Sequence, residues 1–433
     1  GLFGCRAGSE QAMEQARQER GTDRAGVGRR AVLAGAAAAG LGALVAACSP
    51  GPSGPPPASL PPPAPAPTPP PGLPRSAALR AQFEQAAKEL MTPGAALFVR
   101  SSAGELAIPY GSRTDTGSEP ITLADHARIG SITKTFTGTV ILQLAQEGRL
   151  DIDAPVSELR PDVPNGGNIT LAQLLEMRSG LYNYSELPAL NRSLDEHPDK
   201  VWTPEELLKL GLSHPANFAP GSAYEYSNTN IVLLGLIAEQ VERRPLGESY
   251  QARLFTPLGM RETSFPADAA IPAPHPRGYM YGTNMSTLET EALPPDQQAA
   301  AMAGTLKPND VTDASPSWTW AAGGAISTVA DLATWARALT DGTLLNSEWQ
   351  RKRLESVRST DPSKPTAAGY GLGIAKFGPM YGHTGELPGF QSFAGHDPDR
   401  AITLTVWTNL KAAPDGKPPA ATIAQQLIGT IYA

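Results

Sequence analysis

The stretch that decides the fold spans residues 128 to 138 and reads "RIGSITKTFTG". Ser131 and Lys134 stand three positions apart, so a helix that opens at Ser131 would place both side chains on one face. Gly130 lets the chain turn tightly into that helix, which leaves the Ser131 hydroxyl near its positive end. The remaining neighbours are apolar or small. An ammonium group in such surroundings has its charged form disfavoured, and it becomes a usable base near neutral pH.

The same pattern also has a purely structural interpretation. Ser131 could cap the helix while Lys134 extends along the protein surface. A Ser-x-x-Lys match is expected about once by chance in a chain this rich in serine. This motif alone therefore leaves both interpretations open.

Two further polar clusters stand downstream. Tyr226 and Asn228, in "YEYSNTN", precede an apolar helical pattern. They could supply a phenol that relays a proton and an amide that orients a substrate carbonyl, or they could be a helix cap. His383, Thr384 and Gly385, in "YGHTGELPGF", lie in an expected strand where a small residue lets a substrate backbone approach. The alternative there is a glycine-rich turn with a surface histidine.

The segments around these clusters predict a sheet assembled from distant parts of the chain. A hairpin is expected near the start of the folded region, a long and mostly helical middle follows, and strands return before a closing helix. This order indicates an α/β (α+β) fold, with an antiparallel sheet flanked by helices plus an inserted, mostly helical subdomain. The sequences behind it are "GAALFVRS" with "GELAIPYGS", then "GYGLGIAKF" with "AITLTVWTN", and finally "PAATIAQQLIGTIYA".

Taken in order, Ser-x-x-Lys, Tyr-x-Asn and His-Thr-Gly resemble the serine penicillin-recognising enzymes. These comprise class C β-lactamases, D-alanyl-D-alanine carboxypeptidases and related esterases, whose class A relatives carry Ser-Asp-Asn and Lys-Thr-Gly instead. The resemblance runs from about Arg75 to the end of the chain and includes "LLEMRSGLYNY" and "SWTWAAGGAIST". It implies a β-lactamase/transpeptidase-like fold and a serine hydrolase.

The resemblance implies three catalytic residues. Ser131 would attack a carbonyl to form an acyl-enzyme, and Lys134 would take part in the proton transfer. Tyr226 would pass the proton to the leaving group, and the resemblance leaves open whether Lys134 or Tyr226 is the base for acylation. The oxyanion hole would consist of the backbone N–H groups of Ser131 and Glu386.

Further residues receive binding roles from the same resemblance. Asn228 would bind the amide of the substrate's acyl side chain, and Trp318 would form an aromatic wall. His383 and Thr384 would line the opposite wall, where Gly385 leaves room for the substrate.

Glu386 departs from the carboxypeptidase pattern, which has a small hydroxyl residue at this position. A carboxylate that faces the cleft would repel the C-terminal carboxylate of a D-alanyl-D-alanine peptide. The alternative is that Glu386 points away, since neighbouring residues of a strand alternate faces. We expect weak carboxypeptidase activity and better turnover of neutral esters or amides.

The front of the chain predicts export. Residues 1–48 contain Arg29 and Arg30, then a run of small apolar residues that ends at Cys48. This order is typical of a twin-arginine signal followed by a lipoprotein cleavage site, with translation starting at Met13. We expect a lipid on Cys48 that anchors the exported protein on the outer face of the bacterial cytoplasmic membrane. A transmembrane anchor is the alternative.

The remaining expectations concern organisation and partners. Residues 49–74 form a proline-rich linker, and residues 75–433 form the hydrolase domain. The net charge of -7, without a basic patch, disfavours nucleic-acid binding. No metal-binding or Gly-x-Ser-x-Gly motif occurs, so no cofactor is expected. We expect a monomer that acts on a small peptide, β-lactam or ester; the alternative is a non-catalytic lipoprotein that binds the cell wall.

Overall fold

The computed structural model describes residues 73–364 and 368–433. The expected leader at 1–48, the expected lipidation site Cys48 and the expected linker up to residue 72 lie outside the described residues. Within the described ranges, no helix combines the length and apolar character needed to cross a membrane.

An eight-stranded antiparallel sheet forms the centre of the described chain, in the order β2-β1-β12-β11-β10-β9-β8-β7. Strands from both ends of the chain meet where Ala95 pairs with Thr408. This topology confirms the predicted fold class. The strands are β1 (Gly94–Ser101), β2 (Gly104–Gly111), β7 (Arg358–Ser359), β8 (Gly369–Tyr370), β9 (Ala375–Phe377), β10 (Met380–Leu387), β11 (Phe390–Asp397) and β12 (Ile402–Thr408).

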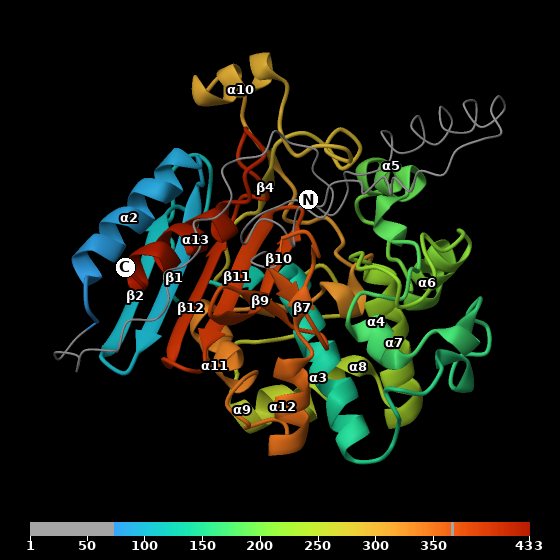
Figure 1. Ribbon diagram of the computed structural model, residues 1–433. Coiled ribbons are helices and arrows are strands. Elements are labelled where there is room, and N and C mark those ends of the chain that lie inside the picture. The colour runs from blue at the N-terminus through green and yellow to red at the C-terminus, as the bar shows by residue number, and fades with distance from the viewer. Residues whose placement is uncertain (1–72, 365–367) are drawn as a thin grey trace, which may run out of the picture.

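Helices cover both faces of this sheet. The N-terminal helix α2 (Ser76–Glu89) and the C-terminal helix α13 (Pro419–Ile431) pack on each other and on one face, which brings the blue and red ends of Figure 1 together. Helix α11 (Val329–Ala338) packs on the opposite face against Ala96, Phe98 and Trp407. The central strands are therefore buried almost throughout rather than on alternate positions, as expected for a sheet covered on both sides.

The predicted helical region is inserted between β2 and the C-terminal strands, and it forms the other half of the molecule (Figure 1). Helix α3 is buried from Thr133 to Ala145 and packs on α7 and α8, which explains its apolar character on all sides. Its principal helices are α3 (Thr133–Gln146), α4 (Leu171–Leu175), α5 (Pro188–Glu196), α6 (Pro204–Leu212), α7 (Asn228–Glu242) and α8 (Leu246–Tyr250).

Smaller elements complete the described chain. Two short strand pairs join the loops near the sheet: β3 (Ala127–Arg128) with β6 (Ile326–Ser327), and β4 (Tyr279–Met280) with β5 (Asn309–Asp310). The remaining helices are α9 (Thr256–Leu258), α10 (Pro295–Met302) and α12 (Ser347–Glu355).

Two local expectations need correction. The continuous strand expected for "GYGLGIAKF" is instead a hairpin, because a turn separates β8 from β9 and Gly373 adopts a left-handed φ of 63° there. The helix expected to open at Ser131 is preceded by a 3₁₀ turn over Gly130–Ile132, and α3 itself begins at Thr133.

Candidate active site

Two glycines bring the Ser131 turn against strand β10. Gly130 has a φ of 52°, and a Cβ at this position would lie 2.5 Å from the backbone nitrogen of Glu386. A Cβ on Gly385 would lie 1.8 Å from the carbonyl oxygen of Ile129. Only residues without a side chain permit this approach. The turn and the strand edge can therefore present the backbone N–H groups of Ser131 and Glu386 to the same place.

Lys134 is directed at Ser131. Its Nζ donates hydrogen bonds to Ser131 Oγ and to the Ala322 carbonyl, both at 2.8 Å. The side chain is fully buried, and burial moves the pKa of the amine well below its ordinary value of 10.5. The alternative interpretation of Lys134 as a surface residue is therefore wrong.

Tyr226 closes the other side of this pair. Its ring centroid lies 4.8 Å from Lys134 Nζ. Burial, reinforced by Tyr370, raises the pKa of the Tyr226 phenol well above 10, and its hydrogen bond with Ser131 lowers that pKa only in part. The phenol is therefore neutral at physiological pH, whereas the lysine is shifted towards its neutral form.

Asn228 begins helix α7 but does not cap it with its side chain. The N-cap is Ser227, and its side chain makes no capping hydrogen bond. Asn228 Nδ2 donates to Ser185 Oγ at 2.9 Å, and its backbone N–H donates to Asn183 Oδ1 at 3.0 Å. Its buried Oδ1 accepts no hydrogen bond from the described residues. The capping interpretation therefore does not account for this side chain, whereas a role in binding uses its unoccupied acceptor.

His383 is buried in β10 rather than exposed in a turn. Its Nδ1 lies 2.6 Å from the carbonyl oxygen of Thr384, and its Nε2 lies 3.1 Å from the Tyr370 hydroxyl. Burial and the proximity of Lys134 lower the pKa of His383 to about 3. The imidazole is therefore neutral at physiological pH, and the surface-histidine alternative is wrong.

Successive side chains of β10 point to opposite faces of the sheet, and this alternation determines the orientation of Glu386. Gly385 lies opposite Ser392, whose Oγ donates to the Ile129 carbonyl at 2.9 Å, so this face meets the Ser131 turn. Glu386 lies opposite Gln391, on the other face together with Thr384.

The Glu386 carboxylate is buried on that face and lies 3.8 Å from Lys411 Nζ. The same ammonium contacts Glu291 at 2.6 Å. Burial raises the pKa of Glu386, and its charge is still close enough to add to the raised pKa of Tyr226. The Glu386 side chain therefore points away from the Ser131 turn, and only its charge is felt at Tyr226.

Trp318 lies in the hydrophobic core, with 2% of its surface exposed. Its carbonyl accepts a hydrogen bond from the Tyr184 hydroxyl at 2.6 Å. It precedes the turn at Trp320–Ala322, which supplies the carbonyl that Lys134 contacts. Its proposed role as an aromatic wall stays a prediction.

Several contributors to the site were not identified from the sequence. They are the Ala322 carbonyl, the Tyr370 hydroxyl, and the pair Asn183 and Ser185 that holds Asn228. The sequence signal was that Asn183, Ala322 and Tyr370 occur in "LLEMRSGLYNY", "SWTWAAGGAIST" and "YGLGI", which resemble the family, and that Ser185 directly follows the first of these.

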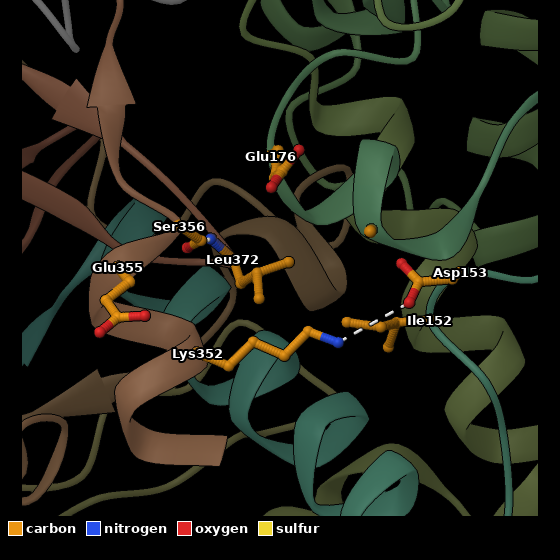
Figure 2. A pocket seen from close by; sticks show the side chains of 8 residues that line it. Ile152, Asp153, Glu176, Lys352, Glu355, Ser356 and Leu372 are labelled. Carbon is orange, nitrogen blue, oxygen red and sulfur yellow. Dashed lines mark hydrogen bonds and ion pairs between the residues drawn. The ribbon is translucent and has the colours of Figure 1, made fainter. Parts of the chain in front are cut away.

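A groove with a volume of about 280 Å³ is lined by other residues (Figure 2). Lys352 reaches across it towards Asp153, with 3.7 Å between Nζ and Oδ2. None of its lining residues belongs to the Ser131 site; they are Ile152, Asp153, Ala172, Glu176, Lys352, Glu355, Ser356 and Leu372. In the described part of the chain, no three His, Cys, Asp or Glu side chains are grouped to hold a metal ion.

Comparison with known proteins agrees with this geometry. The family model described as Beta-lactamase matches residues 80–428. A D-stereospecific amidohydrolase from Streptomyces sp. is 32% identical, with a TM-score of 0.68 over 82% of this chain and 98% of that one. The D-amino acid amidase from Ochrobactrum anthropi SV3 shares the fold at 24% identity, with a TM-score of 0.69 over 82% of this chain and 97% of that one.

Curated relatives match over shorter stretches. Esterase EstB from Burkholderia gladioli is 31% identical over 204 residues, which is 44% of this chain and 51% of the esterase. Protein flp from Staphylococcus aureus (strain MW2) is 36% identical over 142 residues, or 32% of this chain and 27% of that protein. The chain thus spans about a quarter of the length of flp and half that of the esterase. Fold, site geometry and the match over residues 80–428 together show that the chain belongs to the Beta-lactamase family of serine hydrolases.

Proposed function

We propose that this protein is an exported serine hydrolase that cleaves small neutral amides and esters through an acyl-enzyme on Ser131. The observation that carries the proposal is the 2.8 Å contact between Lys134 Nζ and Ser131 Oγ inside a fully buried site. Lys134 forms no ion pair with any carboxylate of the described chain, so no counter-ion there offsets the cost of burying its charged form. A buried amine of this kind has the proton affinity that a general base requires.

The acylation step follows from these positions. The neutral amine of Lys134 takes the Ser131 proton as Oγ attacks the substrate carbonyl. The N–H groups of Ser131 and Glu386 stabilise the negative charge that develops on the carbonyl oxygen. The neutral phenol of Tyr226 gives its proton to the departing amine or alcohol, and the proton taken up by Lys134 then returns to the phenol oxygen. Water hydrolyses the acyl-enzyme and restores the Ser131 hydroxyl. The opposite pKa shifts of Lys134 and Tyr226 favour the lysine as the base for acylation.

The proposed substrates are neutral amides and esters rather than peptides that end in a carboxylate. Amidohydrolase and esterase activities are named for two relatives above 30% identity, which supports this choice. Glu386 adds only weak support, because its carboxylate points away from the Ser131 turn and reaches the site through its charge alone. A non-catalytic wall-binding lipoprotein would have no use for a buried lysine held against a serine hydroxyl.

The test is covalent labelling. A fluorophosphonate probe and a fluorescent penicillin should label the wild type and should not label Ser131→Ala. Ser249→Ala is the matched control, because it removes another buried hydroxyl, that of Ser249 in α8, which accepts from Arg244 Nε at 3.0 Å. Labelling of Ser131→Ala at the wild-type rate would place the nucleophile elsewhere. A panel of D-amino acid amides, small esters, D-alanyl-D-alanine peptides and β-lactams then ranks the substrates.

Export and anchoring are proposed from the leader sequence. A fatty-acid analogue should label the wild type but not Cys48→Ser, and the variant should appear in the soluble exported fraction. Equal labelling of both proteins would overturn the lipid anchor.

A further inference from the structure

Tyr370 is a buried neighbour of the catalytic residues that belongs to none of the three motifs. It is the last residue of β8, directly before the turn that leads to β9. Its hydroxyl lies 3.1 Å from His383 Nε2, and the two rings are perpendicular with centroids 5.6 Å apart. The Tyr370 ring also meets the Tyr226 ring edge to face, with a centroid distance of 6.3 Å.

The hydrogen bonds of His383 determine its tautomer. Nδ1 lies 2.6 Å from the carbonyl oxygen of Thr384, which can only accept, so Nδ1 carries the hydrogen. A neutral imidazole has one N–H, so Nε2 is then an acceptor. The Tyr370 hydroxyl is the group that donates to it.

We infer that Tyr370 is a positioning residue that holds His383 as a neutral imidazole protonated on Nδ1, and thereby keeps a second cation away from Lys134 and Ser131. The inference rests on the proposed function, because it explains how the lysine remains the base. Related motifs have a lysine at this position, whereas here the residue is an imidazole that Tyr370 prevents from accepting a proton on Nε2.

The charges around His383 make its protonation unfavourable. Lys134 approaches from α3, and Tyr226 contributes a neutral phenol from the segment before α7. Behind Tyr370 lies Arg353 of α12, fully buried and close enough to interact electrostatically with Tyr370. Its guanidinium donates to neutral groups, Thr139 Oγ1 at 2.7 Å and the Gly373 carbonyl at 3.2 Å.

An imidazolium at His383 would therefore add a positive charge near Arg353 and near the Lys134 amine, which must itself become positive when it takes the Ser131 proton. It would also disfavour the charged form of Lys134 further. The proton affinity of Lys134 would then be too low for it to take the Ser131 proton efficiently. Removal of the Tyr370 hydroxyl takes away the donor that stabilises the neutral ring, so tautomer exchange or proton uptake becomes easier.

The first experiment reads the tautomer directly. Nitrogen-15 NMR of the histidine rings of the wild type should show one ring with Nδ1 protonated and Nε2 unprotonated, unchanged over the pH range in which exposed histidines titrate. His383→Asn identifies the signal by deleting it. In Tyr370→Phe the same ring should show averaged tautomers or titrate at higher pH. A wild-type His383 protonated on Nε2, or a ring unaffected by Tyr370→Phe, would overturn the inference.

The second experiment asks whether Tyr370 acts through His383. Tyr370→Phe should lower kcat/KM for a neutral ester about tenfold to a hundredfold, the loss expected when one buried acceptor is left unpaired. In a His383→Asn background the same change should have little further effect, because Asn lacks the Nε2 acceptor. An equal loss in both backgrounds would show that Tyr370 acts elsewhere.

Tyr250→Phe is the matched control. Tyr250 is also fully buried and contacts one hydroxyl, Thr137 Oγ1, at 2.6 Å. Its replacement should leave the His383 tautomer unchanged. The two proposals fail separately: activity retained in Ser131→Ala would overturn the proposed function, whereas the NMR result tests Tyr370 without any turnover.

Discussion

The two ends of helix α3 hold charge in opposite ways. At its start, Lys134 is buried and donates only to a hydroxyl and a carbonyl oxygen. Just beyond its end, Glu147 accepts from Arg253 at 2.6 Å, and Arg253 also contacts Glu242 at 2.8 Å.

The pKa shifts follow the pairing. Hydrogen bonding to Arg253 lowers the pKa of Glu242 to about 2 and raises that of Arg253, so this network keeps its charges at all physiological pH values. Burial without a counter-ion lowers the pKa of Lys134 instead. Paired charges tie the helices together, whereas an unpaired buried charge becomes available for proton transfer.

The largest expected effect is that of Lys134→Met. The substitution keeps an unbranched side chain of similar length and removes the amine, so kcat/KM should fall about 10²–10⁴-fold, the usual contribution of a general base. The free energy of unfolding should not decrease, because the buried amine has no counter-ion to lose. Ester hydrolysis and denaturant unfolding measure the two quantities. A Lys134→Met variant that is destabilised but still active would show that Lys134 stabilises the fold and does not transfer the proton.

The pH dependence sharpens the same contrast. The rate of Ser131 labelling should rise with pH through the lowered pKa of Lys134, without an inflection near 6.5 from His383, whose pKa is about 3. The unfolded chain binds the Lys134 proton up to about pH 10.4. Stability should therefore rise with pH between the folded and unfolded values, since the unfolded state binds more protons there.

Lys134→Met should remove both dependences. The measurements are labelling rates and urea unfolding as functions of pH. A pH profile of labelling that is unchanged in His383→Asn agrees with this assignment. If the rise of the labelling rate with pH is lost in His383→Asn, the titrating group is His383 rather than Lys134.

At the other end of α3, Arg253→Gln should lower the free energy of unfolding by about 1–3 kcal/mol. The substitution leaves the Glu242 carboxylate, whose side chain is 3% exposed, with fewer donors. The value of kcat/KM should change less than about twofold, because surface and distant substitutions leave the site geometry intact. Arg351→Gln is the control, since its contact with Glu355 is long and exposed. A large loss of activity without destabilisation would show that the two ends of the helix are coupled.

The smallest expected effect is on substrate preference. Glu386→Thr should raise the ratio of D-alanyl-D-alanine peptide to neutral ester turnover by a few-fold. The effect is small because the carboxylate points away from the Ser131 turn and lies beside Lys411. Glu386→Gln removes the charge but keeps the size, so an equal change in both variants identifies charge as the cause. If the ratio of peptide to ester turnover changes in neither variant, Glu386 acts only through its backbone N–H.

The sequence predicted what depends on local pattern. The hairpin of β1 and β2 and the C-terminal helix α13 follow from spacing and turns over a few residues. The spacing of Ser131 and Lys134 predicted that their side chains could meet, although Ser131 lies in the 3₁₀ turn before α3. These parts need no knowledge of tertiary structure.

The missed parts depend on pairing between distant segments. The Tyr370 hydroxyl reaches His383 only because β8, β9 and β10 pair in one register. The Ala322 carbonyl reaches Lys134 across 188 positions of sequence. The break after Tyr370 was missed because the glycines of "GYGLGIAKF" also occur in strands. No local spacing indicates any of these contacts.

The pairing of β1 with β12 determines when the central sheet can form. Gly94 N–H donates to Asn409 Oδ1 across 315 positions. The edge of β1 that pairs with β12 is therefore covered only after β12 has been synthesised. Contacts of such separation form slowly, because a long loop must close before they contribute. The Ser131 turn rests on β10, within the same C-terminal group of strands. A nascent chain therefore cannot assemble the Ser131 site before residues 380–387 of β10 have left the ribosome.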